Sequence, residues 1–143
     1  MPVDLAKIHP ALGARVPTLL RNCLSRGAEY RVTCGLRTTK EQDALYAQGR
    51  TTPGKIVTNA KGGQSHHNYG CAVDFVRIIH DSASWAKDSY KILADEARKL
   101  GLESGYYWTS FSDAPHVQLP FALKALQTTY ADGGLRAVYI MPI

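Results

Sequence analysis

The start of the chain has apolar residues at steps of three and four positions, which is the spacing of one face of an α-helix. Pro17 lies inside this pattern, so we expect it to start or kink the main helix. Gly27 is a suitable end for that helix, because glycine readily adopts the left-handed conformation found there. The apolar positions are Leu5, Ile8, Leu12, Val16, Leu19, Leu20, Cys23 and Leu24.

The two segments that follow predict a strand and a short helix. Residues 29–36, EYRVTCGL, are rich in β-favouring side chains and predict a strand. Thr38 and Glu41 stand three positions apart, as in a capping box, so a helix should begin there. We expect that helix to end at Gly49.

The middle of the chain predicts a loop, a buried strand and a long helix. Residues 50–64 contain the turn dipeptides PG and GG, which indicate a loop. The near-continuous apolar run 71–79, CAVDFVRII, predicts a buried strand. Residues 84–101, SWAKDSYKILADEARKLG, predict an amphipathic helix with a terminal glycine. Its apolar side carries Trp85, Ile92, Leu93, Ala97 and Leu100.

The last part of the chain predicts three short elements. Residues 116–119, HVQL, predict a strand, and residues 121–134 predict a final helix. Residues 135–143 indicate a packed tail or an edge strand. Helices and strands interleave without a repeating strand–helix–strand rhythm, which argues against a doubly wound sheet. We therefore expect an α+β fold, with a small, mostly antiparallel sheet flanked by helices in a single domain, residues 1–143.

The composition is that of an ordinary soluble domain. The chain has 143 residues and a mass of 15.7 kDa, with 45% hydrophobic and 20% charged residues. It lacks an apolar run of the roughly 20 residues that span a bilayer. Residues 1–13 also lack the basic and apolar regions of a secretory signal. We expect a protein that is made in the cytoplasm without a signal peptide and that is not inserted into a membrane.

The net charge is +5 and the isoelectric point about 9.2. A basic surface suits a polyanionic partner such as nucleic acid, anionic lipid or an acidic cell wall. The Lys and Arg residues are scattered, however, and equally serve solubility. Because the sequence shows no stacking-aromatic motif and no recognition helix, we do not expect it to bind nucleic acid.

The cysteines do not predict a disulfide framework. There are three of them, Cys23, Cys34 and Cys71, and none belongs to a CxxC pair. Cys23 lies on a helical apolar stripe and Cys34 in a strand-like run, so we expect both in the core. Cys71 lies four residues after a histidine, where a thiolate is a possible zinc ligand, but we expect it to pack as a small apolar residue.

The first chemistry-bearing motif is SHHNYGCAVDF, residues 65–75. His67 and Asp74 are seven positions apart, and Gly70 between them lets the chain turn. A carboxylate in an apolar strand is costly unless it is paired or bound to a metal. Two interpretations are open: His67 and Asp74 bind a metal, or Asp74 accepts backbone hydrogen bonds beside two surface histidines.

The second motif is DAPH, in which Asp113 precedes His116 by three positions. In a straight strand these side chains would face opposite ways, but Pro115 favours a bend that brings them together. A proline turn followed by a strand histidine is the alternative. The two motifs together supply two histidines, one metal-binding carboxylate and one spare carboxylate, the set that a hydrolytic zinc site requires.

A third segment, GLRTTKEQDALYAQGR, adds candidates for substrate binding. Arg37 stands at the end of a predicted strand, where its fixed fork of donors can clamp a carboxylate or a developing oxyanion. Solvation at the surface is the alternative. Gln42 and Tyr46 share one face of the following helix and are candidates for the wall of the same cleft, although Tyr46 also suits the core.

Together these motifs resemble those of the D-alanyl-D-alanine carboxypeptidase-like zinc peptidases, and most closely the phage endolysins that are L-alanyl-D-glutamate peptidases. The S-x-H-x(6)-D motif of that family is matched by Ser65, His67 and Asp74. Its acid-x-x-His motif is matched by Asp113 and His116. The combination of the two motifs is specific, whereas each motif alone is not.

The resemblance covers about residues 30–119 and implies a role for each matched position. One departure concerns the stretch Ser104–Tyr107, close to which many relatives have a tryptophan; this places the substrate preference in question. The implied roles are zinc ligation by His67, Asp74 and His116, general-base catalysis by Asp113, a substrate contact by Arg37, and support or substrate binding by Ser65.

The resemblance implies a monomeric, zinc-dependent bacteriolytic peptidoglycan hydrolase that cleaves the L-alanyl-D-glutamate bond of stem peptides. Such an enzyme would act on the cell wall, in the periplasm, after its release from the cytoplasm, and we expect no separate wall-binding domain. One alternative is a D-alanyl-D-alanine carboxypeptidase or dipeptidase on the same class of substrate. The other is a zinc-binding module without catalysis.

Overall fold

Strand β2 lies in the middle of an antiparallel sheet, and three other strands pair with it. The computed structural model describes residues 2–143. Strands β1 and β5 flank β2, β3 returns beside its end, and β4 extends the sheet beyond β5. The strands are β1 (Glu29–Cys34), β2 (Ala72–Ile79), β3 (Ser82–Ser84), β4 (Glu103–Ser104) and β5 (His116–Gln118).

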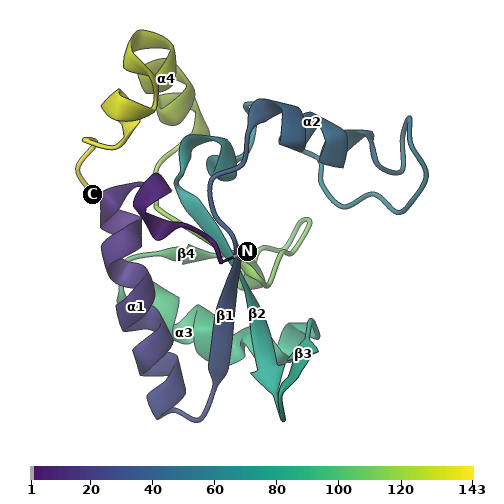
Figure 1. Cartoon of the computed structure of the whole chain (residues 1–143), viewed down its shortest axis with the longest axis vertical. Helices are drawn as coiled ribbons and strands as arrows, with labels where there is room; N and C mark the ends of the chain where they lie inside the picture. Colours follow the sequence, from purple (N-terminus) through teal and green to yellow (C-terminus); the bar gives the residue numbers. More distant parts are fainter. Residues whose placement is uncertain (1) are drawn as a thin grey trace.

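Helices cover one face of this sheet and extend from its edges. Helices α1 and α3 pack against each other and against strands β1 and β4, whereas α2 and the loop after it extend away from α1 (Figure 1). The helices are α1 (Pro10–Ser25), α2 (Thr39–Ala47), α3 (Lys91–Lys99) and α4 (Leu123–Val138). Within residues 2–143 there are also the 3₁₀ helices η1 (Leu5–Lys7), η2 (His66–Tyr69), η3 (Lys87–Tyr90) and η4 (Gly105–Tyr107). The expected α+β class is thus confirmed.

The core lies between the sheet and the pair α1 and α3. Val73 and Phe75 of β2 are fully buried, and they alternate with Asp74, which therefore lies on the opposite face of the strand. Burial of each large apolar side chain contributes about 1.5–3 kcal/mol to folding. The core residues of the helices include Leu12, Val16, Leu19 and Cys23 of α1 and Leu93 and Ala97 of α3. No helix among the described residues is both long and apolar enough to cross a membrane.

The first helix begins earlier than the proline pattern predicts. Helix α1 starts at Pro10, directly after its N-cap His9, and runs past Pro17 to Ser25. A proline at the first helical position has no hydrogen bond to lose and already has a helical φ, so Pro10 is the better start. Of the two alternatives for Pro17, a start or a kink, the structure excludes the start, because Pro17 lies inside the helix. The capping box of Thr38 and Glu41 is present at the start of α2, as predicted.

The long helix predicted over residues 84–101 is much shorter. Ser84 pairs with Arg77 in a β2–β3 hairpin, and α3 begins only at Lys91. The hairpin turn is formed by His80 and Asp81, both with positive φ, the geometry of a type I′ turn. The sequence lacks the usual Asn-Gly signal for such a turn, which explains the error. Trp85 is consequently 58% exposed rather than packed on a helical face.

The carboxyl-terminal segment is also helical where a tail or edge strand was expected. Helix α4 continues to Val138, across a kink at Gly134 that has a φ of 69°. Residues 135–138 therefore add a last helical turn rather than a strand. Strand β4 was not predicted, because two residues carry too little periodicity to be recognised.

Buried His9 joins three segments of the chain. Its ring Nδ1 accepts a hydrogen bond from the Ala11 amide at 3.1 Å, and its Nε2 donates to the Met141 carbonyl at 3.0 Å. The His9 amide donates to the Gly70 carbonyl at 2.9 Å. Burial disfavours the charged ring and lowers the pKa of His9. The neutral ring is also the form that caps α1, because Nδ1 accepts the bond from Ala11 with its lone pair. The amino-terminal helix and the carboxyl-terminal segment thus depend on one neutral imidazole, and the main-chain amide of the same residue holds the turn after η2.

This arrangement predicts a pH-dependent contribution of His9 to stability. The unfolded chain takes up a proton on His9 below about pH 6.5, whereas the folded chain resists it. We expect the unfolding free energy of the native protein to fall more steeply from pH 7 to pH 5 than that of His9→Asn. Asparagine keeps the N-cap acceptor but does not titrate. Urea unfolding at each pH measures the difference, and equal slopes for the two proteins would contradict the assignment.

Candidate metal centre

Asp74 is the central residue of the site, because the sheet register places a metal-binding side chain on each side of it. On β5, His116 is its cross-strand partner, and on β1, Cys34 is its partner. Directly opposed residues in antiparallel strands project from the same face with their Cβ atoms about 4.5–5.5 Å apart. The register alone therefore brings a carboxylate, an imidazole and a thiol together on the face of the sheet away from α1.

A β-bulge turns Cys34 toward this site. Val32 pairs with Phe75 and Cys34 with Asp74, so Thr33 is an extra residue in β1. In a regular strand without the bulge, Thr33 would pair with Asp74, and Cys34 would share the core-facing side with Val32. The expectation that Cys34 lies in the core was therefore wrong. Its Sγ lies 3.8 Å from His67 Nδ1.

His67 reaches Asp74 from η2, whose start is fixed by a second capping box. Ser65 Oγ accepts from the His67 amide at 3.2 Å, and the Asn68 side chain accepts from the Ser65 amide at 3.2 Å. Gly70 ends η2 with a φ of 67°, and a Cβ atom there would collide with the Tyr139 ring. This tight reversal places His67 Nε2 3.1 Å from Asp74 Oδ1.

Asp113 and His116 come together through a turn, as the DAPH pattern predicts. The His116 amide donates to the Asp113 carbonyl at 3.1 Å, which closes the turn around Pro115. His116 Nδ1 then lies 3.3 Å from Asp74 Oδ1 and 3.9 Å from Asp113 Oδ2. Gly105 is needed behind this turn, because a Cβ atom there would lie 2.2 Å from the Asp113 carbonyl oxygen.

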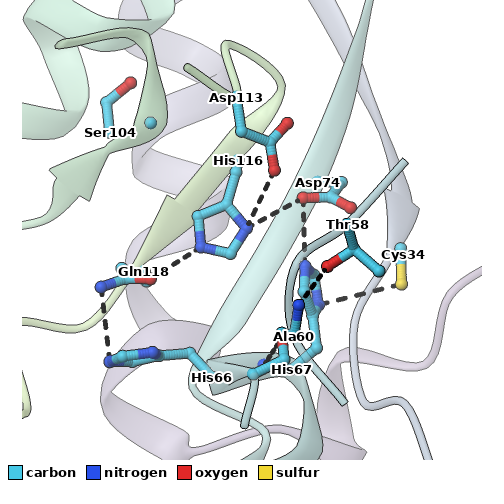
Figure 2. Close-up of polar contacts among 12 residues, drawn as sticks. Cys34, Thr58, Ala60, His66, His67, Asp74, Ser104, Asp113, His116 and Gln118 are labelled. Carbon is cyan, nitrogen blue, oxygen red and sulfur yellow. Dashed lines mark hydrogen bonds and ion pairs between the residues drawn. The ribbon is translucent and has the colours of Figure 1, made fainter. Parts of the chain in front are cut away.

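The hydrogen bonds of the two histidines leave one nitrogen of each directed at Asp74. His67 Nδ1 donates to the Gly35 carbonyl at 2.8 Å. His116 Nε2 contacts Gln118 Oε1 at 2.7 Å (Figure 2). Imidazoles that bind metals are oriented by such an oxygen on the far nitrogen. The nitrogens that face the metal position are therefore Nε2 of His67 and Nδ1 of His116.

The donor set fits zinc, and so does the distance of each histidine from Asp74. In a tetrahedral zinc site with bonds of about 2.0–2.2 Å, neighbouring ligand atoms lie about 3.3 Å apart. His67 Nε2 and His116 Nδ1 lie 3.1 and 3.3 Å from the same Asp74 oxygen. Two trios have ligand atoms within 4.8 Å of one another: Cys34, His67 and Asp74, and Asp74, Asp113 and His116. Among the described residues, the three expected ligands are divided between these two trios, which share Asp74, and they do not form a trio of their own at this distance.

The site strongly favours a positive charge beside Asp74. Burial raises the pKa of Asp74, but the charge of His67 and hydrogen bonds from both histidines lower it far below its usual range. Burial likewise lowers the pKa of His67, but the Asp74 carboxylate raises it to about 10. A buried carboxylate that stays ionised in this way is suited to hold a cation.

Asp113 differs from Asp74 in its surroundings. Its side chain is 42% exposed, and burial of the carboxyl group raises its pKa although His116 opposes the shift. Asp113 thus stays next to the metal position without sharing the close contacts of Asp74. A carboxyl group with a raised pKa beside a metal position is better suited to accept and release a proton than an ordinary aspartate.

Arg37 joins this group, whereas Gln42 lies behind it. Arg37 Nη2 is 3.6 Å from Asp74 Oδ2 and 3.2 Å from Cys34 Sγ. Gln42 is only 1% exposed and does not line the cleft, so the expectation that it binds substrate needs correction. Its Oε1 accepts from Arg37 Nη1 at 2.9 Å, and its Nε2 donates to the Ala60 carbonyl at 2.8 Å. Gln42 therefore fixes Arg37 against the loop after α2.

A cleft of about 540 Å³ opens over these residues. Residues 57–60 form one wall, and Ser65 and Arg37 also line it. Trp108 and Phe111 belong to the lining as well, and the Trp108 ring lies 5.2 Å from that of His116. Neither aromatic residue was predicted to belong to the site, although the run GYYW, residues 105–108, was a signal for an aromatic wall near the DAPH motif.

The remaining residues considered from the sequence lie outside the metal position. His66 Nε2 donates to the Phe121 carbonyl at 2.7 Å. Cys71 is fully buried in the core, and burial raises the pKa of its thiol to about 12. Tyr46 stacks under the Arg50 guanidinium, 3.8 Å from the ring centroid, and does not line the cleft.

A family model described as VanY, D-alanyl-D-alanine carboxypeptidase, matches residues 6–118. The chain belongs to this family. Among its relatives is the peptidoglycan L-alanyl-D-glutamate endopeptidase CwlK of Bacillus subtilis, 38% identical over 83% of this chain and 77% of CwlK. Another is the L-alanyl-D-glutamate peptidase of Listeria phage A118, 29% identical over 68% of this chain but only 32% of the phage protein. The family that the sequence motifs resemble is thus confirmed, and two of its endopeptidases are among the relatives.

Solved structures of peptidoglycan-related peptidases have the same fold. The Serratia marcescens L-Ala D-Glu endopeptidase ChiX superposes with a TM-score of 0.60 at 29% identity, over 82% of this chain and 84% of ChiX. A mutant VanY D,D-pentapeptidase from a VanB-type vancomycin resistance cassette, in complex with Zn(II), gives a TM-score of 0.58 at 19% identity. This match covers 94% of this chain and 84% of that one.

The position of Gln42 predicts a large cost for its replacement by leucine. Gln42→Leu leaves the partly buried Ala60 carbonyl and one Arg37 donor without their partners, which costs about 1–3 kcal/mol of unfolding free energy. Gln48→Leu is the matched control, because it removes a bond to the Lys55 carbonyl in an exposed position. We expect it to cost less than about 1 kcal/mol. Equal losses in denaturant unfolding would refute the supporting role of Gln42.

Proposed function

We propose that this protein is a zinc-dependent peptidoglycan peptidase that cleaves the L-alanyl-D-glutamate bond of stem peptides. The observation that carries the proposal is the convergence of His67, Asp74 and His116 with Asp113 beside them, at the floor of an open cleft. CwlK, the phage peptidase and ChiX, to which the chain is similar, are described as acting on this bond.

The zinc ligands in this proposal are His67 Nε2, Asp74 Oδ1 and His116 Nδ1. Two neutral imidazoles and one carboxylate form a ligand set typical of catalytic zinc, which keeps a further position open. When bound, zinc would polarise the scissile carbonyl and make a water molecule more acidic. The Gly35 main-chain carbonyl and the Gln118 side chain, on the far sides of the two histidines, hold these nitrogens in place.

Asp113 is the proposed general base. Its carboxylate lies beside the ligand His116 but faces the cleft, so it can accept the proton of an attacking water molecule. The same carboxyl group can then give that proton to the leaving amine. The pKa of Asp113, raised by burial, favours both steps more than an ordinary aspartate would.

Arg37 is the proposed donor to negative charge on the substrate. Its guanidinium faces the cleft next to Asp74, and its other nitrogen is anchored by Gln42. A preorganised donor of this kind stabilises an oxyanion without having to reorient during the reaction. Ser65 supports the site indirectly, since it caps the turn that carries His67.

The substrate places the site of action at the cell wall. Stem peptides are rich in carboxylates, and a net charge of +5 favours their approach. Action as a monomer through this catalytic domain is part of the same proposal. So is release from the cytoplasm, because peptidoglycan lies outside the membrane.

Removal of the proposed base should separate catalysis from metal binding. We expect Asp113→Ala to retain zinc at one ion per chain and to lose at least 100-fold in peptide cleavage. Metal analysis of the purified protein and a stem-peptide cleavage assay measure the two effects. A variant that loses zinc as well would move Asp113 into the ligand set, and one that keeps activity would favour another base.

The bond that is cut can be read from the products. Digestion of purified peptidoglycan should release stem peptides that begin with D-glutamate, as mass spectrometry of the soluble fragments would show. A zinc chelator should stop this release and added zinc should restore it. Release of free D-alanine with the stem peptides still attached would replace the proposal by the carboxypeptidase activity that the family description carries.

A further inference from the structure

A buried amide, Gln118, is the direct partner of the ligand His116, and nothing in the reaction itself requires it. Both residues lie on β5 at positions i and i+2, so they project from the same face of the strand. Gln118 is 6% exposed, and its Oε1 lies 2.7 Å from His116 Nε2. Amide and carbonyl ends differ only in their hydrogen bonds, so its neighbours must decide which end faces the histidine.

Glu103 decides the orientation of this amide. It is the cross-strand partner of Gln118 in the β4–β5 pair, and its Oε2 lies 3.2 Å from Gln118 Nε2. A carboxylate only accepts hydrogen bonds, so the NH₂ group of Gln118 must face Glu103 and the carbonyl end must face His116. His116 Nε2 then carries the ring hydrogen, and Nδ1 presents its lone pair to the metal position.

His66 favours the opposite orientation more weakly. Its Nε2 lies 3.3 Å from Gln118 Nε2 but donates its hydrogen to the Phe121 carbonyl at 2.7 Å. A reversed amide would accept from His66 only by sharing that hydrogen, and it would set two acceptors together at Glu103. Because hydrogen bonds to a charged group are about twice as strong as neutral ones, Glu103 prevails.

We propose that Glu103 and Gln118 form a positioning relay that fixes the tautomer of His116 and so presents Nδ1 for metal binding. This inference rests on the proposed function for the identity of the metal. In a reversed amide, the ring hydrogen of His116 would move to Nδ1, on the side of Asp74, and block that ligand. An exposed carboxylate on the edge strand thereby controls a metal ligand that it does not touch.

Zinc affinity tests the relay directly. We expect Gln118→Leu to raise the dissociation constant for zinc about 10–100-fold, as is typical when the oriented partner of a metal-binding histidine is lost. Glu103→Ala should raise it about two- to fivefold, because an exposed hydrogen bond is lost rather than the direct partner. Titration against a chelator of known affinity measures both effects with zinc alone as the probe.

An exchange of the two residues distinguishes the relay from simple packing. In Glu103→Gln with Gln118→Glu, the carboxylate accepts from His116 and the amide on β4 donates to that carboxylate. We expect zinc affinity within about threefold of the native protein, since carboxylates are common partners of metal-binding histidines. Glu29→Ala, which removes a half-exposed carboxylate from β1, is the control and should leave zinc affinity unchanged.

The His116 ring gives a spectroscopic signature of the same relay. In the zinc-loaded protein, nitrogen NMR should show a slowly exchanging hydrogen on Nε2, which Gln118→Leu loses and the exchanged pair retains. Native zinc affinity in Gln118→Leu would overturn the relay. So would failure of the exchanged pair to restore affinity, or an equal effect of Glu29→Ala and Glu103→Ala.

Peptide cleavage is assayed separately, so that the two proposals can fail independently. The expected pattern of zinc affinities without cleavage of the L-alanyl-D-glutamate bond would uphold the relay and reject the proposed function. Cleavage of this bond, with a zinc affinity that is unchanged in Gln118→Leu, would uphold the proposed function and reject the relay. A native protein that binds no zinc would overturn both.

Discussion

The structure depends on keeping one carboxylate charged in the middle of a sheet. Asp74 lies on the central strand with neighbours on both sides, and its side chain is only 20% exposed. An ionised carboxylate in such a position is unfavourable unless positive charge or donors surround it. They are supplied by His67 of η2, His116 of β5 and Arg37 of the segment after β1. Because these come from separate elements, folding of the sheet and assembly of the site are the same event.

The loop after α2 shows how a segment without regular structure can still be well defined. Side chains of the α2 region donate to or accept from it at several points: Gln42 to the Ala60 carbonyl, Asp43 from the Gly62 amide, and Arg50 to the Thr58 carbonyl. Each bond fixes a backbone group that would otherwise need water. The wall of the cleft is therefore anchored to the same helix that anchors Arg37, and the position of the wall and that of the guanidinium are coupled through Gln42.

The sequence was sufficient for those parts of the site that depend on local turns. Gly70 and the capping residue Ser65 explain why His67 returns to Asp74, and Pro115 explains why Asp113 and His116 meet. The other contacts of the site depend on the register between strands, which no local sequence pattern indicates. The extra residue Thr33 in β1 turns Cys34 out of the core, and pairing between β4 and β5 places Glu103 beside Gln118.

The fold was likewise predicted correctly where a local signal decides it, and wrongly where strand pairing decides it. The capping box at Thr38 is a local signal and fixed the start of α2 correctly. Trp85 shares an apolar periodicity with α3, but the hairpin at His80 and Asp81 draws its segment into the sheet. Strand pairing satisfies backbone groups that an isolated first helical turn leaves open, so the hairpin outweighs a weak helical pattern.

The two histidines of the site are held by groups of different kinds, and this difference determines how each can change. His67 is oriented by the Gly35 carbonyl, a main-chain group that no substitution can remove without moving the backbone. His116 is oriented by a side-chain amide, whose two ends have the same shape and opposite hydrogen-bonding roles. One ligand therefore follows from the fold, whereas the other depends on the identity of residues on β4 and β5. A metal site built in this way can keep its ligands and its fold while its affinity varies with an edge strand.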